Sequence, residues 1–202
     1  KYNNTSILTH DLFSNNSILE ANKKTLGIRA IPSYNIEKAK IIIGLNSDFL
    51  GNYVSPVFYA NKYSAWKNSK NNTGNKNKHI QIETSPTITG ISADERFIID
   101  SSREIAFLEE LLFTIQKVKN TNIRSNKIKS TFTFSQEIAN NCLDNPNESV
   151  IISDSQDKLV QILINMINYE IGAYKRIIDF NKSFNNYSSN ESQLKSSIDK
   201  LG

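Results

Sequence analysis

Two polar loops, each placed after a short isoleucine-rich run, hold the residues best suited to bind a nucleotide. The runs are residues 41–43 and 80–82. Glycine lets a backbone approach a phosphate closely, and amide, hydroxyl and carboxylate groups hydrogen-bond to ribose or a base. The two loops therefore predict a dinucleotide pocket or its remnant. Its candidate residues are Gly44, Asn46, Asp48, Glu83, Thr84, Thr87, Thr89 and Asp94.

The same polar residues have a purely structural interpretation, which stays open beside the first. Asn, Asp, Thr and Ser satisfy loop backbone groups and cap helices in most proteins. Catalytic and metal-binding residues are not expected: Cys142 is the single cysteine, and His10 and His79 lack partners at ligand spacing. No nucleophile elbow, phosphate-binding P-loop or pair of catalytic carboxylates is found in the sequence.

Alternating strand and helix patterns must position these loops. They predict an α/β, Rossmann-like three-layer fold with a mainly parallel sheet. We expect a turn around Pro32 at residues 31–33 and one helical turn at 35–40. The expected strands are residues 5–9, 41–43, 79–82, 97–99 and 149–152, and the expected helices are 14–26, 55–67, 101–118, 135–143 and 155–170.

Several local signals refine these elements. Gly27 is expected to end the first helix in the left-handed conformation. Ser55-Pro56 reads as a helix start, and a capping box is expected at Ser101 and Glu104. Helix 155–170 is apolar on nearly every side, so we expect it to be covered from both directions. Residues expected to face the sheet from helix 55–67 are Val57, Ala60, Ala65 and Trp66.

The domain organisation expected is one domain over residues 1–180, followed by a polar tail at 181–202 that leads to a missing next segment. A tail helix at 191–201 carries Leu194, Ile198 and Leu201 at helical spacing. We expect this stripe to dock on the domain or on a second copy, because an apolar patch would otherwise stay exposed.

Composition excludes some classes of partner. The 202 residues are 38% hydrophobic and 22% charged, with a net charge of +4, as in ordinary globular proteins. No block of basic residues alternates with aromatic ones, so nucleic acid is not favoured as a partner. No apolar run approaches the ~18 residues of a membrane span.

The order of the loop motifs resembles the molybdopterin oxidoreductase family. Gly44 and Asn46 match the Gly-x-Asn that ends one family strand, and Ile82–Glu83 stand where the family has Val-Asp. Further matches are Thr87, Thr89, Ala93 and Asp94, while Ser101, Ser102 and Glu104 occupy the positions of Pro, Gly and Asp.

Residues 7–180 are most similar to one branch, the molybdopterin-like part of the large iron–sulfur subunit of alternative complex III, a bacterial quinol oxidoreductase. Residues 48–50 (DFL), 55–57 (SPV) and 164–180 carry this likeness. The resemblance implies a fragment of a respiratory electron-transfer subunit at the periplasmic face of the bacterial inner membrane. Its partners would be other domains and subunits of a membrane-associated complex, with no membrane span of its own.

The resemblance also bears on cofactors. Family enzymes hold molybdopterin guanine dinucleotide in these loops, whereas this branch shares the fold and is understood to lack molybdenum. Here Ser85 replaces the family arginine, so a bidentate phosphate partner is lost. Residues 9–11 (THD), where a molybdenum ligand would lie, hold no Cys or Ser. We therefore expect a scaffold without bound cofactor or metal.

Two alternatives remain open. The chain could be part of a true oxidoreductase that binds molybdopterin guanine dinucleotide, with upstream and downstream domains completing the site. It could also be a generic nucleotide-binding Rossmann protein, although no Gly-x-Gly-x-x-Gly loop follows any expected strand.

Overall fold

A four-stranded parallel sheet forms the centre of the computed structural model, which describes residues 15–69, 77–121, 131–184 and 191–199. The strand order is β4-β3-β2-β5, and each neighbouring pair is parallel. This confirms the α/β prediction and is consistent with a Rossmann-like fold, while the expected strand at 5–9 lies outside the described residues. The strands are β2 Ile41–Leu45, β3 Lys78–Glu83, β4 Glu95–Ile98 and β5 Ser149–Ile152.

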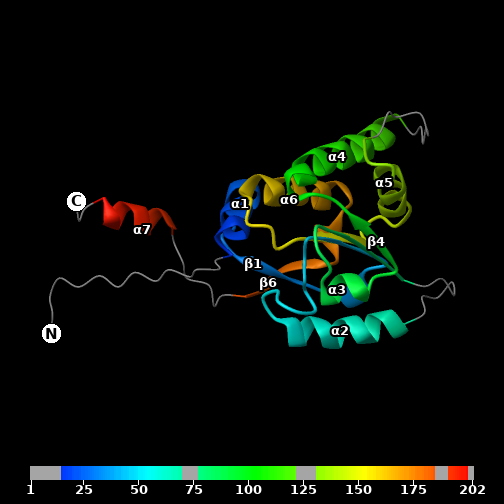
Figure 1. Ribbon diagram of the computed structural model, residues 1–202, viewed down its shortest axis with the longest axis horizontal. Helices are drawn as coiled ribbons and strands as arrows, with labels where there is room; N and C mark the ends of the chain where they lie inside the picture. Colours follow the sequence, from blue (N-terminus) through cyan, green and yellow to red (C-terminus); the bar gives the residue numbers. More distant parts are fainter. Residues whose placement is uncertain (1–14, 70–76, 122–130, 185–190, 200–202) are drawn as a thin grey trace.

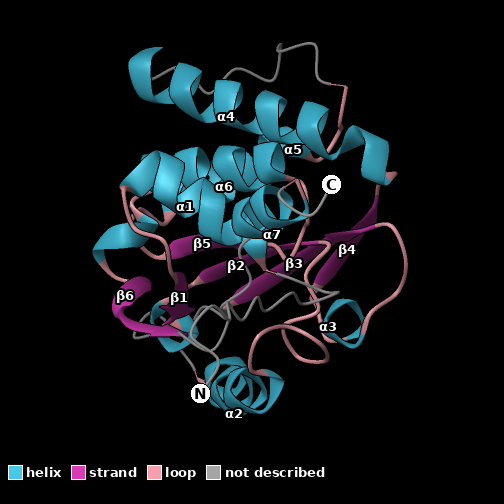
Figure 2. Cartoon of the chain, turned by 90° about the vertical axis from the view of Figure 1, so that its left-hand side faces the viewer, coloured by secondary structure: helices cyan, strands magenta, loops and turns pink. Residues whose placement is uncertain are grey.

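Helices cover both faces of this sheet, which gives three layers (Figures 1 and 2). The isoleucines of β2 and β3 are fully buried between the layers, as a parallel sheet requires. One face carries α2 Pro56–Asn68 and the short α3 Ile88–Ile91, and the other carries α1 Asn16–Leu26, α4 Glu104–Thr121, α5 Ser135–Asp144 and α6 Lys158–Glu170.

A separate antiparallel ribbon pairs β1 Ile31–Tyr34 with β6 Ile178–Phe184. The turn expected at 31–33 was therefore wrong. Pro32 lies within a short strand in which all four residues are buried, so burial of Ile31 and Tyr34 outweighs the turn signal. Because β6 extends to Phe184, the expected domain end at 180 was too early. The single helical turn expected at 35–40 is confirmed as η1 Ile36–Lys38.

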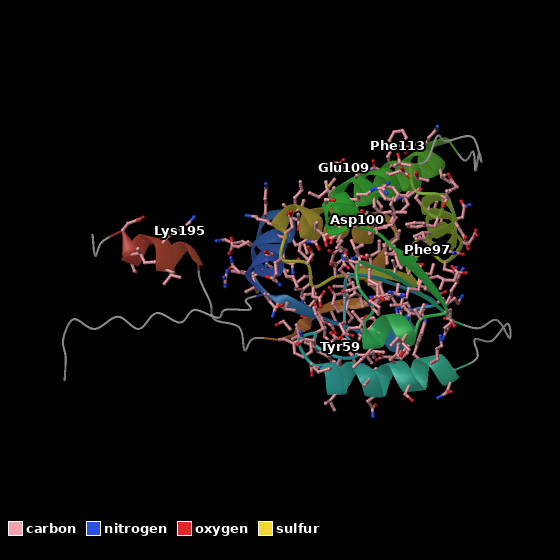
Figure 3. The ribbon with its side chains drawn as sticks, in the orientation of Figure 1. Tyr59, Phe97, Asp100, Glu109, Phe113 and Lys195 are labelled. Atoms are coloured by element: carbon pink, nitrogen blue, oxygen red, sulfur yellow. The ribbon has the colours of Figure 1, made fainter. Side chains whose placement is uncertain are left out.

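The buried face of α2 differs from the expected one. Val57 is 83% exposed, and Ala60 and Ala65 are also exposed. Instead the aromatic residues at i, i+4 and i+7 face the sheet, because they bury more area and their polar atoms find partners. These are Tyr59 (Figure 3), Tyr63, whose hydroxyl donates to Ser92 O at 2.8 Å, and Trp66, whose Nε1 donates to Ala39 O at 2.6 Å.

Helix α6 begins at Lys158, three residues later than expected, since Asp157 caps it by accepting from Leu159 N at 2.7 Å. The helix packs between α1 and α4 and against β5. Its buried face is not purely apolar, because it includes Gln161 and Asn168. Cover for α6 on its flanks thus comes from within the described domain, which the sequence reading had not anticipated.

The two buried amides of α6 close the outer edge of β5. Asn168 accepts from Ile151 N and donates to Ile151 O, both at 2.9 Å. Gln161 donates to Ser153 O at 3.2 Å. An edge strand in a buried setting needs such partners for its backbone groups.

The helix-end predictions had mixed outcomes. Gly27 is left-handed (φ 74°) and ends α1, as expected. Ser101 begins the 3-10 turn η2 Ser101–Arg103 instead of capping α4, and the Glu104 carboxylate turns toward Asn46. Neither Asn15 nor Ser55 makes a side-chain capping bond.

The tail helix α7 Glu191–Ile198 lies away from the rest of the protein (Figure 1), and Ile198 is 58% exposed. Docking of this helix on the domain is therefore not observed, and docking on a second copy stays a prediction. Leu201 lies outside the described residues. No helix in the described part of the chain is long and apolar enough to cross a membrane.

Candidate functional site

A cavity of about 550 Å³ lies at the carboxyl edge of the sheet, where the chain changes direction between β2 and β5. The loop after β2 leads to α2 on one face, and the loop after β5 leads to α6 on the other. Such a divergence opens the crevice in which open α/β sheets bind ligands. The cavity is lined by Asn15, Gly51, Asn52, Tyr53, Val54, Pro56, Asp154 and Gln156.

Asp154 is the one charged residue among these lining residues. Its Oδ2 accepts from Asp48 N at 3.3 Å. Burial raises the pKa of Asp154 to about 6, and the nearby carboxylates of Asp48 and Glu104 add to this rise. The cavity therefore presents a carboxyl group that exchanges a proton near pH 6 and carries no cation among the described lining residues.

Tyr53 supplies a second unusual group. Its side chain is 3% exposed, and its hydroxyl has no hydrogen-bond partner within the described structure. Burial holds the pKa of this hydroxyl well above its ordinary value, and the neighbouring Tyr34 and Tyr59 act in the same direction. A buried hydroxyl without a partner is costly, and a bound ligand is one way to satisfy it.

Asn46 ties three loops together instead of projecting into the cavity. Its backbone is left-handed (φ 44°). Its Oδ1 accepts from Thr84 N at 2.8 Å, and its Nδ2 donates to Glu104 Oε1 at 2.5 Å. The Thr84 hydroxyl lies 3.0 Å from Ser101 Oγ. Both amide functions of Asn46 are thus used within the protein.

Asp48 is similarly engaged. Its Oδ1 accepts from Thr89 N at 3.1 Å and from Thr89 Oγ1 at 2.8 Å. Thr89 Oγ1 in turn accepts from Leu50 N at 3.0 Å. These bonds join the loops after β2 and β3, so the two loops predicted to lie together do so.

Glu83, at the end of β3, is completely buried. It accepts from Thr87 Oγ1 at 2.7 Å, from Gln81 Nε2 at 3.3 Å and from Arg96 Nε at 2.5 Å. Burial alone would raise the pKa of Glu83, but the hydrogen bonds from Thr87 and Arg96 hold it below the ordinary value. Thr87 also caps α3 by accepting from Gly90 N at 2.9 Å.

Three glycines make room for these polar side chains. A Cβ at Gly44 would overlap the Gln81 amide, and one at Gly90 would overlap the Glu83 carboxylate. Gly51 is placed in the same way against Asp48. The sequence reading assigned Gly44 to a phosphate, whereas the structure shows it facing the side chain of Gln81.

Asp94 is separated from the other candidates. It directly precedes β4, at the amino edge of the sheet. Its Oδ2 accepts from His79 N at 2.8 Å, and Lys67 lies 2.6 Å from its Oδ1. Burial opposes ionisation here, but these bonds keep the pKa of Asp94 below its usual value. The structure thus does not bring Asp94 together with Asn46 and Asp48.

The sequence reading missed a polar row along one face of β3. Alternate residues His79, Gln81 and Glu83 are buried, and His79 Nδ1 lies 2.9 Å from Tyr63 Oη. Gln81 Nε2 donates to Ser47 O at 2.9 Å. Burial lowers the pKa of His79 to about 4, so the ring is neutral near pH 7. The period of two in the residues was the available signal.

Asp154 was also missed, although the rule applied to β2 and β3 would have found it in the loop after β5. Metal chemistry has no support in the described ranges, where no three His, Cys, Asp or Glu side chains gather as a ligand group. Cys142 is buried, and burial raises the pKa of its thiol to about 12, which makes it a poor nucleophile.

Comparison with protein-family models gives no match, and comparison with curated proteins gives none either. The chain is therefore identified here by its architecture, as an α/β protein whose parallel sheet is consistent with a Rossmann-like fold.

Proposed function

We propose that this chain is a molybdopterin-oxidoreductase-like domain of a respiratory quinol oxidoreductase subunit, and that it acts as a scaffold without bound molybdenum. The observation that carries the proposal is the charge of the cavity at the carboxyl edge. Its described lining holds a single carboxyl group, Asp154, and no lysine or arginine. A pyrophosphate-bearing cofactor placed there would meet like charge and no cationic partner.

The engagement of the loop residues supports the same role. Asn46, Asp48 and Glu83 direct their side chains to groups of the protein itself. Such bonds stabilise the loops as a rigid surface. By the sequence resemblance, neighbouring iron–sulfur and haem-bearing subunits at the periplasmic face of the inner membrane would be the groups supported.

The test is the cofactor content of the intact subunit made in a host that synthesises molybdopterin. Elemental analysis should find no stoichiometric molybdenum, and the oxidised extract should show no pterin fluorescence. A known molybdoenzyme made in the same host is the positive control. Stoichiometric metal or pterin would overturn the scaffold role.

The alternative, an oxidoreductase that binds molybdopterin guanine dinucleotide, is favoured by the position of the 550 Å³ cavity and by the unpartnered Tyr53 hydroxyl. Gly44, Asn46, Glu83 and Thr89 would then lie at the nucleotide end. Calorimetric titration of the intact subunit with guanosine diphosphate separates the two roles. Heat that is lost in Asn46→Ala supports the alternative, and no heat supports the scaffold.

A further inference from the structure

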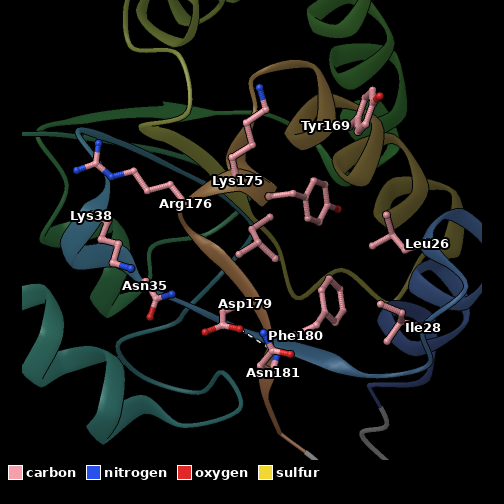
Figure 4. Close-up of a pocket in the computed structure, with 12 residues that line it drawn as sticks. Leu26, Ile28, Asn35, Lys38, Tyr169, Lys175, Arg176, Asp179, Phe180 and Asn181 are labelled. Atoms are coloured by element: carbon pink, nitrogen blue, oxygen red, sulfur yellow. Dashed lines mark hydrogen bonds between the residues drawn. The ribbon is translucent and has the colours of Figure 1, made fainter.

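The amino edge of the sheet carries a hollowed surface around Tyr169, at the opposite end of the sheet from the cavity of Asp154. Tyr169 is 74% exposed and lines three hollows of about 620, 170 and 450 Å³. Figure 4 shows the largest of them, between the end of α1, the end of α6 and the start of β6. We call this region the Tyr169 surface.

The Tyr169 surface is apolar at its centre. Ile28 is 44% exposed and Met166 is 43% exposed. The rings of Tyr174 and Phe180 stack with centroids 6.4 Å apart and line the largest hollow. An exposed aromatic residue bordered by hollows is the arrangement found at the energetic centre of many protein interfaces. The surface is therefore suited to apolar side chains of another protein segment.

The charge around this centre is positive. Lys38 and Lys175 line the largest hollow and make no ion pair with any described residue. Arg176 also lines it and pairs with Glu148, which lies outside the lining. The one carboxylate in that lining belongs to Asp179, which accepts from Asn181 N at 2.9 Å. An acidic partner would gain two cations that have no partner in the chain.

We propose that the Tyr169 surface binds an acidic segment of a partner protein that also carries apolar side chains. A second copy is disfavoured because a two-fold contact would place these lysines against each other. The parts of this chain outside the described residues carry no acidic excess, since residues 1–14 hold Lys1 and Asp11, and residues 185–202 hold two acids and two lysines. The inference extends the proposed scaffold role by naming the chemistry of a partner, but rests on its own observations.

The test is binding of a labelled synthetic peptide of about 14 residues, with Leu at every third or fourth position and Glu between, measured by fluorescence anisotropy. The matched control peptide has Lys in place of Glu. We expect the acidic peptide alone to bind, with affinity falling as salt rises. Tyr169→Ala, and separately the pair Lys38→Glu and Lys175→Glu, should each weaken binding about tenfold or more.

Two control variants report on non-specific effects. Phe113→Ala removes an exposed aromatic residue of α4 (Figure 3), and Lys158→Glu reverses an exposed charge at the start of α6; both should bind like the wild type. The proposal is overturned if the acidic peptide does not bind at about 1 mM, if both peptides bind equally or if the Tyr169 and lysine variants bind normally. It is also overturned if sedimentation shows a dimer that Tyr169→Ala dissociates. Molybdenum content is measured separately, so either proposal can fail alone.

Discussion

Each buried polar side chain at the carboxyl edge is matched by a glycine. Gly44 faces the amide of Gln81, and Gly90 faces the carboxylate of Glu83. The glycine is needed here because the space of a methyl group is already filled by a hydrogen-bonded side chain. This differs from the use of glycine for positive φ, which in this chain applies to Gly27 and Gly172.

Gly44→Ala should lower the free energy of unfolding by about 1–3 kcal/mol, because the added methyl group displaces the Gln81 amide from Ser47 O. The double variant Gly44→Ala/Gln81→Ala removes the overlap. Its loss should be smaller than the sum of the two single losses by roughly 1 kcal/mol or more. Urea denaturation of all four proteins measures this coupling. Additive losses would show that the two residues do not compete for space.

His79 and Asp154 change stability in opposite directions over the same pH range. The pKa of His79 is about 4 in the folded protein and 6.5 ordinarily, so the unfolded chain takes up the proton first and stability falls as the pH drops from 6.5 to 4. The pKa of Asp154 is about 6 in the folded protein and 3.8 ordinarily. Here the folded state takes up the proton first, so stability rises as the pH drops through that range. The two effects partly offset each other.

Asp154→Asn should therefore raise the free energy of unfolding at pH 7 by about 1–2 kcal/mol, less than the full pKa difference implies because the carboxyl group is part-exposed. The new amide oxygen can still accept from Asp48 N. The gain should vanish near pH 4, and the loss of stability on acidification should become steeper. Urea denaturation at several pH values tests this. An equal gain at every pH would contradict the assigned titration.

Residue-level prediction from the sequence succeeded where a rule of position applied. The loops after β2 and β3 do meet, through Asp48 and Thr89. Asp94 could not be placed correctly, because the chain between β3 and β4 is so short that it returns to the opposite edge within a few residues. The roles of Gln81 and His79 depend on neighbours distant in sequence, Ser47 and Tyr63, which no local pattern reveals.

Among the elements, α6 shows why a nearly continuous apolar pattern was misleading. Gln161 and Asn168 lie seven residues apart and so share one helix face, which binds the outer edge of β5. From sequence these amides read as interruptions of an apolar helix. In the structure they are the side chains that terminate the sheet, because β5 has no further strand beside it among the described residues.

Asn168→Leu should lower the free energy of unfolding by about 2–4 kcal/mol, because it leaves both Ile151 N and Ile151 O without partners in a buried setting. Asn68→Leu, at the exposed end of α2, is the matched control and should change stability by less than about 0.5 kcal/mol. Urea denaturation compares the two variants. A loss for Asn168→Leu no larger than that of the control would show that β5 does not need this partner.

Element existence was predicted well and element faces less well. All four strands of the sheet were expected from β-branched runs bounded by polar residues. The buried face of α2 was wrong because helical spacing alone admits several faces, and the aromatic face was decided by tertiary partners such as Ala39 O. Strand β1 was missed because its partner β6 is distant along the chain.

For the whole molecule, charge divides the two edges of the sheet: a carboxyl group lies in the cavity at one edge, and unpaired lysines line the hollow at the other. Helix α7 belongs to neither edge in this structure. Truncation after Phe184 should leave the melting temperature of the body unchanged, because α7 does not pack on it. Analytical ultracentrifugation should show that the full chain associates weakly and the truncated chain does not, since the Leu194 and Ile198 stripe is removed. A fall in melting temperature on truncation would show that the tail docks on the domain.

The position of β5 in the sheet has a consequence for synthesis of the chain. Strand β2 pairs with β3 on one side and with β5 on the other, and β5 is the last of the four strands to leave the ribosome. Until then one edge of β2, with its isoleucines, has no partner in the sheet and is open to pairing with another nascent chain. Translation through Ser149–Ile152 and α6 is therefore the step that ends this exposure. Ribosome-bound chains stalled before residue 149 should be recognised by chaperones more strongly than chains stalled after residue 184.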